Sequence, residues 1–130
     1  MAKTLAEYQQ IFTTNIAYLI AYANTIGVKL TFGEADRTES QQLLYFYGAK
    51  LKEVAGKLMI KNDKIRSRTK NSNHLRRLAV DFNFFIEGQS VYHDELITRL
   101  GAFWESLDEY NRWGGNFENK DTPHFEMNIP

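Results

Sequence analysis

The spacing of apolar residues along the chain predicts three amphipathic helices. Over residues 4–25, apolar side chains recur every three or four positions, as they do in a helix that packs one face on a core. A second helix is predicted over 39–51, behind Thr38 as its N-cap residue, and Gly48 is a candidate for an earlier end. A third helix, over 93–110, carries leucine and aromatic side chains along one side.

Alternation of apolar and polar residues predicts the strands. Residues 28–36 and 78–86 have the period of strands with a buried face, and a turn after the second leads to a short edge strand at 91–92. A further short strand is expected within 121–127, whereas 57–73 lacks apolar periodicity and reads as a long exposed loop. Since helices and antiparallel strands follow one another in segregated order, the predicted fold class is α+β, a small antiparallel sheet packed with about three helices.

Length and composition indicate one compact domain. A chain of 130 residues with 43% hydrophobic content can bury one core, so we expect a single domain over 1–130 without a separate wall-binding domain. The absence of cysteine excludes disulfides, thiolate metal ligands and thiol nucleophiles, and leaves His, Asp and Glu for such chemistry. The apolar run at 16–23 is too short to cross a bilayer and follows polar residues, so neither membrane insertion nor a signal peptide is expected.

Charge is balanced overall but unevenly distributed. The formal net charge is zero, yet ten of the sixteen basic residues lie within 50–77 and ten of the sixteen acidic residues lie from Asp81 onward. Such a basic segment is usually a solvated surface. It also allows a different class of function, a non-catalytic binding module that contacts nucleic acid or an anionic wall polymer through this region.

Two short segments carry the residues best suited to chemistry. Asp81 lies in the middle of an otherwise apolar predicted strand, where a carboxylate is costly to bury unless it is paired or binds a metal. His74 precedes that strand in a loop. Near the C-terminus, Asp121 and His124 lie on either side of Pro123, whose ring restricts the backbone and holds the two side chains in a set relation. Taken one at a time, these residues are more typical of ordinary surface groups than of a metal site.

Taken together, the segments "FGEADRT", "SNHLRRLAVDF", "WGGNF" and "DTPHF" resemble, in this order and spacing, a known family. This is the family of zinc peptidases that contains D-alanyl-D-alanine carboxypeptidases and L-alanyl-D-glutamate endopeptidases, and it includes single-domain bacteriophage endolysins. The resemblance implies a zinc site in a cleft on the sheet, with His74, Asp81 and His124 as ligands and an open fourth position. It implies that Asp121 is the catalytic carboxylate that moves a proton.

The resemblance also implies roles for three further residues. Arg37 would lie near the substrate carbonyl or carboxylate and stabilise a developing oxyanion, although it could instead pair with an acidic neighbour at the surface. Ser72 would help to hold the substrate, or is one more loop hydroxyl. Trp113, before two glycines, is expected in a wall of the cleft or, equally, in the core.

Three other residues near these motifs have weaker interpretations. Arg77 stands where many family members carry glycine, and an arginine beside the cleft would alter substrate choice or pair with substrate acids. Asn83 shares a strand face with Asp81 and is a candidate hydrogen-bond donor to the metal ligands. His93 has no family counterpart and is interpreted as a surface or capping residue.

The implied activity is that of a zinc metallopeptidase that degrades the bacterial cell wall. The expected target is the peptidoglycan stem peptide, at the L-alanyl-D-glutamate bond, as in an antimicrobial phage endolysin; the alternative within the same chemistry is a D-alanyl-D-alanine carboxypeptidase or dipeptidase. We expect a monomer without a nucleic-acid partner. It would be made in the host cytoplasm and would act on the wall, in the periplasm or outside, after release.

Overall fold

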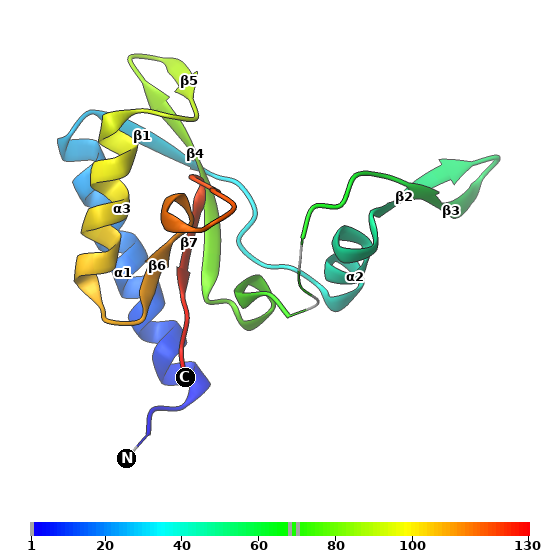
Figure 1. Cartoon of the computed structure of the whole chain (residues 1–130), viewed down its shortest axis with the longest axis horizontal. Coiled ribbons are helices and arrows are strands. Elements are labelled where there is room, and N and C mark those ends of the chain that lie inside the picture. Colours follow the sequence, from blue (N-terminus) through cyan, green and yellow to red (C-terminus); the bar gives the residue numbers. More distant parts are fainter. Residues whose placement is uncertain (1, 68, 70) are drawn as a thin grey trace.

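The computed structural model describes residues 2–67, 69 and 71–130, and it confirms the α+β class (Figure 1). The elements are α1 (Leu5–Thr25), β1 (Val28–Phe32), α2 (Glu39–Tyr47), β2 (Ala49–Val54), β3 (Lys57–Asn62), the 3-10 helix η1 (Asn73–Arg76), β4 (Ala79–Ile86), β5 (Gln89–Val91), α3 (Glu95–Leu107), β6 (Asn111–Trp113), the 3-10 helix η2 (Gly114–Asn116) and β7 (His124–Met127). No helix in the described part of the chain is long and apolar enough to cross a membrane.

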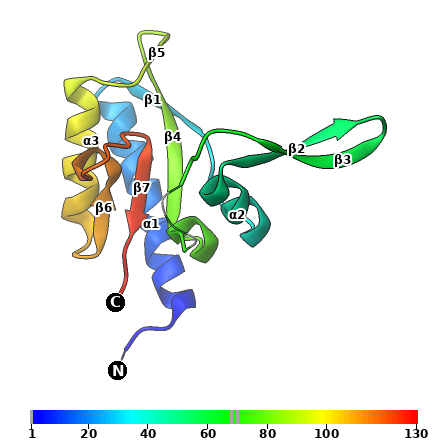
Figure 2. The ribbon, with the colours of Figure 1, turned by 45° about the vertical axis from the view of Figure 1, so that its right-hand side comes forward.

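The main sheet is antiparallel and is organised around β4. Its strands lie in the order β1, β4, β7, β6, and β5 forms a hairpin with β4. Helices α1 and α3 lie on one side of this sheet, while α2 and the β2–β3 hairpin lie on the other, as both views show (Figures 1 and 2). One sheet face is therefore covered by helices, and the other is left for the site described below.

Successive side chains of β4 point alternately into the core and toward the site. Val80, Phe82 and Phe84 are buried among residues of α1 and α3. Trp104 of α3 packs edge-on against Phe125 of β7, with ring centroids 6.0 Å apart. Because successive strand residues point to opposite faces, the odd-numbered residues of β4 point away from this core. A carboxylate at position 81 thus avoids the apolar interior.

The second helix is shorter than the sequence pattern predicted. It ends at Tyr47 because Gly48 adopts the left-handed conformation, with φ 70°, and its N–H bonds to the Leu44 carbonyl. Glycine takes this conformation without the steric cost that a Cβ imposes. The predicted N-cap is present, since the Thr38 side chain accepts a hydrogen bond from the Gln41 N–H.

The prediction of a long loop over 57–73 was wrong at the two ends of this segment; between them, 63–67, 69, 71 and 72 form no helix or strand, and positions 68 and 70 lie outside the described residues. Residues 49–62 form the β2–β3 hairpin, closed by a turn at Ala55 and Gly56 with φ 52° and 77°, and 73–76 form η1. The hairpin has no buried face and its turn lacks the usual Asn-Gly or Asp-Gly pair, so two of the common strand and hairpin signals are missing. The short strand β6 was also missed, as its three residues were taken for part of a glycine turn.

Arg77 follows η1 in the left-handed conformation, with φ 57°, which explains the glycine expected there from the resemblance. Its side chain is largely exposed, and its Nε lies 3.8 Å from Asp36 Oδ2, so it makes only a weak surface ion pair. We expect Arg77→Val to destabilise the protein by about 1 kcal/mol or more, because a β-branched residue tolerates this backbone poorly, and Arg77→Gly to cause no loss. Urea unfolding measures both, and Arg76→Val, at a helical position, is the control. Equal stability of Arg77→Val and Arg77→Gly would contradict the strain argument.

Candidate metal and catalytic site

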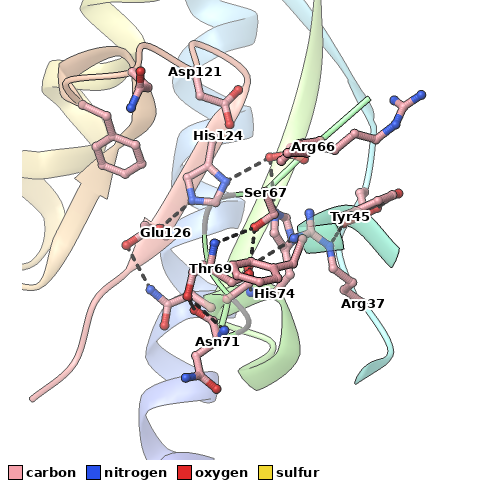
Figure 3. A pocket seen from close by; sticks show the side chains of 18 of the residues that line it. Arg37, Tyr45, Arg66, Ser67, Thr69, Asn71, His74, Asp121, His124 and Glu126 are labelled. Atoms are coloured by element: carbon pink, nitrogen blue, oxygen red, sulfur yellow. Dashed lines mark hydrogen bonds and ion pairs between the residues drawn. The ribbon is translucent and has the colours of Figure 1, made fainter. Parts of the chain in front are cut away.

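A pocket of about 1210 Å³ opens between the uncovered face of the sheet and the segment that contains α2. Its lining includes side chains from β4, β7 and η1 on one side, and Arg37, Tyr45 and Arg66 on the other. Figure 3 shows these groups around one opening, with His74 and His124 close together. Residues far apart in sequence therefore meet in one polar pocket.

The three residues proposed as metal ligands converge in this pocket. Asp81 of β4 is the direct cross-strand partner of His124 of β7, so both side chains leave the same face of the sheet. His74 comes from η1, just before β4. Asp81 Oδ1 lies 3.1 Å from His124 Nδ1 and 3.5 Å from His74 Nε2, and the three ligand atoms all lie within 4.8 Å of one another.

This donor set fits a divalent transition metal such as zinc. A tetrahedral ion with ligand bonds of about 2.0–2.1 Å holds its ligand atoms about 3.3 Å apart. The two distances to Asp81 Oδ1, 3.1 and 3.5 Å, lie close to that separation. Two imidazoles and one carboxylate also match the three-ligand sets of catalytic zinc sites, which keep a fourth position open.

The backbone around His74 fixes which ring nitrogen faces the cluster. The Ser72 hydroxyl accepts a hydrogen bond from the His74 N–H and so caps η1. The His74 Nδ1–H donates to the Ala35 carbonyl at 3.4 Å. With its other nitrogen occupied in this way, the ring directs Nε2 toward Asp81, and a metal ligand held by an outer partner is the usual arrangement.

His124 is held by a carboxylate that the sequence analysis did not single out. Its Nδ1 faces Asp81, and its Nε2 lies 2.6 Å from Glu126 Oε1. The other oxygen of Glu126 accepts a hydrogen bond from the Asn73 side chain at 2.9 Å, so Glu126 connects β7 to the 3-10 helix that carries His74. The signal was present: residues two apart on a strand share a face, and Glu126 follows His124 by two.

The close contacts within this cluster shift the pKa values of Asp81 and His124. Burial alone would raise the pKa of Asp81, but hydrogen bonds from His124 and His74 outweigh it and hold this pKa well below the usual range. For His124, burial favours a lower pKa, whereas hydrogen bonds to Asp81 and Glu126 raise the pKa to about 9. Without metal, the imidazolium of His124 thus lies between two carboxylates, and a metal ion must displace its proton to bind.

Glu126→Ala should weaken metal binding about ten- to a hundredfold, because the His124 ring loses the partner that orients it. Titration calorimetry or competition with a chromophoric chelator measures this affinity without relying on activity. Glu126→Gln should retain more affinity than Glu126→Ala, since its amide oxygen can still accept the Nε2–H bond. Glu109→Ala, at an exposed position, is the matched control. Wild-type affinity in Glu126→Ala would show that the ring needs no such support.

Asp121 lies beside His124 in the pocket (Figure 3). Its N–H donates to the Gly114 carbonyl at 2.9 Å, and its carbonyl accepts from the His124 N–H at 3.1 Å. A Cβ on Gly114 would collide with the Asp121 carbonyl oxygen, so this tight turn requires glycine there. Burial is the main cause that raises the pKa of Asp121; the nearby charge of His124 acts in the opposite direction.

Arg37 faces this pocket and is held by several groups. Its Nε donates to Glu34, and its Nη1 donates to Gln42 Oε1 at 2.6 Å and to Ser72 Oγ at 3.4 Å. The guanidinium also lies 4.9 Å from the centre of the Tyr45 ring. Arg37 therefore does pair with an acidic neighbour, Glu34, as the alternative interpretation of the sequence predicted. This pair is not on the open surface, however, since the Arg37 side chain is only 10% exposed.

The remaining predicted residues are placed as follows. Ser72 lines the pocket as the cap of η1. Trp113 does not line it: the side chain is 5% exposed and its Nε1 donates to the Thr122 carbonyl at 2.8 Å, so it lies in the core behind the Asp121 turn. Asn83 donates to Thr31 Oγ1 rather than to a ligand, and His93 is exposed beside Asp94, the N-cap residue of α3.

Comparison with known proteins agrees with this geometry. The family model described as D-alanyl-D-alanine carboxypeptidase matches residues 66–127, the part of the chain that contains His74, Asp81, Asp121 and His124. The crystal structure of the Serratia marcescens L-Ala D-Glu endopeptidase ChiX matches with a TM-score of 0.61 at 20% identity, over 94% of this chain and 84% of that one. At this identity the match shows a shared fold.

A search among curated proteins found no match. The family match and the shared fold nevertheless agree with each other and with the motifs in the sequence. The match over residues 66–127 confirms the resemblance of the sequence motifs to the D-alanyl-D-alanine carboxypeptidase family of peptidases.

Proposed function

We propose that this protein is a zinc-dependent endopeptidase that cleaves the stem peptides of bacterial peptidoglycan between L-alanine and D-glutamate. The observation that carries the proposal is the convergence of His74, Asp81 and His124 in one pocket with Asp121 beside them. The match of residues 66–127 to a family model of peptidases supports the reaction class. The fold shared with an L-Ala D-Glu endopeptidase supports the choice of bond.

His74 Nε2, Asp81 Oδ1 and His124 Nδ1 would hold the metal. When bound there, Zn²⁺ would act as a Lewis acid and lower the pKa of water to roughly 7. The chain supplies the orientation: Ala35 and Glu126 hold the outer nitrogens of the two imidazoles, and the ligand nitrogens consequently face Asp81. This support is typical of zinc sites.

Asp121 would move the proton. As a carboxylate it accepts a proton from the attacking water when the water oxygen bonds to the scissile carbonyl carbon. It then donates this proton to the leaving amine nitrogen as the carbon–nitrogen bond breaks. The raised pKa, caused mainly by burial, makes Asp121 a stronger base toward water than an ordinary aspartate.

Arg37 would stabilise negative charge on the substrate. A carbonyl oxygen becomes an oxyanion when water adds to the carbon, and a fixed cation in a pocket lowers the energy of that state. Glu34, Gln42 and Ser72 hold the guanidinium in place before the substrate arrives, so little reorganisation is needed. Ser72 would also contact the substrate from the cap of η1.

A second candidate is a D-alanyl-D-alanine carboxypeptidase or dipeptidase, favoured by the description of the family model. The same proton transfer applies, and only the position of the cleaved bond differs. We also propose that residues 1–130 act as one catalytic domain and a monomer, in the manner of a phage endolysin. Such a protein would be made in the host cytoplasm and would reach the wall after release.

Digestion of purified peptidoglycan tests these proposals. The protein is assayed as prepared, after chelator treatment and after zinc is restored, and mass spectrometry identifies the new amino termini. Chelator-sensitive, zinc-restored release of a D-glutamate amine supports the endopeptidase, while release of terminal D-alanine selects the second candidate. Wall polymer or nucleic-acid binding that survives chelation, without any cleavage, would favour the non-catalytic binding module.

A further inference from the structure

The β2–β3 hairpin projects from the body of the protein and is uncovered along its length (Figures 1 and 2). Every residue from 50 to 62 is exposed. The apolar side chains among them include Leu51, Leu58 and Ile60, which are 54%, 73% and 69% exposed. Exposed apolar residues that gather on one element commonly mark an interaction surface.

The strand register gives this hairpin two different faces. Leu51 is the cross-strand partner of Ile60, and Leu58 lies on the same face, opposite Glu53. The other face carries four lysines together with Val54 and Met59; the lysines are Lys50, Lys52, Lys57 and Lys61. We call the first the leucine face and the second the lysine face. The hairpin is therefore amphipathic although neither face meets a core.

The lysine face has no close ion pair within the described residues, although Asp63 interacts electrostatically with Lys50. Lys50 and Lys61 are direct cross-strand partners, an arrangement in which like charges repel. None of the four lysines forms an ion pair with the part of the chain that the structure describes. A nearby anionic surface would replace this repulsion with attraction, so the charge pattern points to an anionic partner.

The leucine face decides which anionic partner fits. A hydrated polyanion, such as a wall polymer or a nucleic acid, would match the lysines but leave Leu51, Leu58 and Ile60 in water. A second copy of the chain, packed through its own leucine face, would cover the apolar side chains but leave the lysine face, on the opposite side of the hairpin, without an anionic partner. The interface of an anionic bilayer accepts both: apolar side chains enter the acyl boundary, and lysine stems extend around the open strand edges to the phosphates.

We propose that the β2–β3 hairpin is a peripheral docking element for anionic lipid bilayers. Leu51, Leu58 and Ile60 enter the interface, and the four lysines hold the lipid phosphates. The contact is superficial, because each strand has only six residues and is too short to span the hydrocarbon layer. Docking depends on the hairpin alone, so it is independent of the metal site and of peptidase activity.

Sedimentation with unilamellar vesicles tests the proposal. The intact protein is mixed with vesicles of phosphatidylcholine alone or of equal parts phosphatidylcholine and phosphatidylglycerol, at low and high salt. We expect at least tenfold stronger binding to the vesicles that contain phosphatidylglycerol, weakened by salt because the charges are exposed. Metal-free protein should bind equally well.

Substitutions assign the binding to the two faces. Lys57→Gln should weaken binding to the anionic vesicles about fivefold, and Leu58→Ser about tenfold or more. The matched controls are Lys120→Gln and Tyr18→Ser, exposed residues on other elements, and they should bind like wild type. Urea unfolding of each variant shows whether the body of the protein is intact, and the lysine substitution leaves the leucine face unchanged.

Three results would overturn the proposal. The first is an equal affinity for neutral and anionic vesicles. The second is binding to soluble polyphosphate, sensitive to Lys57→Gln, without binding to vesicles, which would identify a hydrated polyanion as the partner. The third is a dimer in solution that Leu58→Ser converts to a monomer, again without vesicle binding, which would identify a second copy.

Discussion

Asp121→Asn should leave metal binding intact and lower the hydrolysis of peptidoglycan stem peptides about a hundred- to ten-thousandfold, the range for a lost general acid or base. Asparagine has nearly the shape of aspartate, and the contacts that hold the turn use the Asp121 backbone, to Gly114 and His124. The fold and the ligands should therefore persist. The amide, however, neither accepts a proton from water nor returns one to the leaving amine.

The rate is measured as kcat/KM on a soluble stem peptide, and bound zinc is measured on the same sample. Glu118→Gln is the matched control, because Glu118 lines the same pocket but is exposed. This variant should keep wild-type turnover. Wild-type turnover in Asp121→Asn would assign the proton transfer to another group, and loss of zinc from that variant would show that Asp121 supports the ligands instead.

The fold was largely predictable where a residue pattern reports burial. The alternation of β4 is strong because one face packs on α1 and α3, so both the strand and the unusual position of Asp81 were visible. The β2–β3 hairpin buries neither face, and the same periodicity argument consequently failed there. Trp113 shows the other limit: its three-residue strand is too short for a period to reveal which side it faces.

The candidate site residues could be named from the sequence, but the way in which they come together could not. Asp81 and His124 are 43 positions apart, and only the pairing of β4 with β7 makes them cross-strand partners. Gln42 illustrates what was missed. A glutamine on a short helix is ordinarily exposed, yet this one is fully buried, because it accepts from Arg37 and donates to Ser67. Such a bridge becomes visible only when distant segments are brought together.

His124→Ala should abolish zinc binding and, with it, hydrolysis. The variant loses one of the three proposed ligands and also the cation that separates Asp81 from Glu126, so the remaining cluster is two carboxylates and one imidazole. Loss of a direct ligand should exceed the hundredfold effect of losing an outer partner such as Glu126. The affinity is measured by competition with a chromophoric chelator.

Thermal or urea unfolding gives a second readout that needs no substrate. Zinc at about one hundred times its dissociation constant should stabilise the wild-type protein by about 2.7 kcal/mol, because it binds the folded state alone. At the same concentration it should not stabilise His124→Ala. The chain has three histidines, and His93 is exposed beside Asp94 and is not part of the candidate metal group, so His93→Ala is the matched control and should respond like wild type. If His93→Ala lost the zinc response while His124→Ala kept it, the metal would lie elsewhere and the pairing of Asp81 with His124 would be an ordinary ion pair.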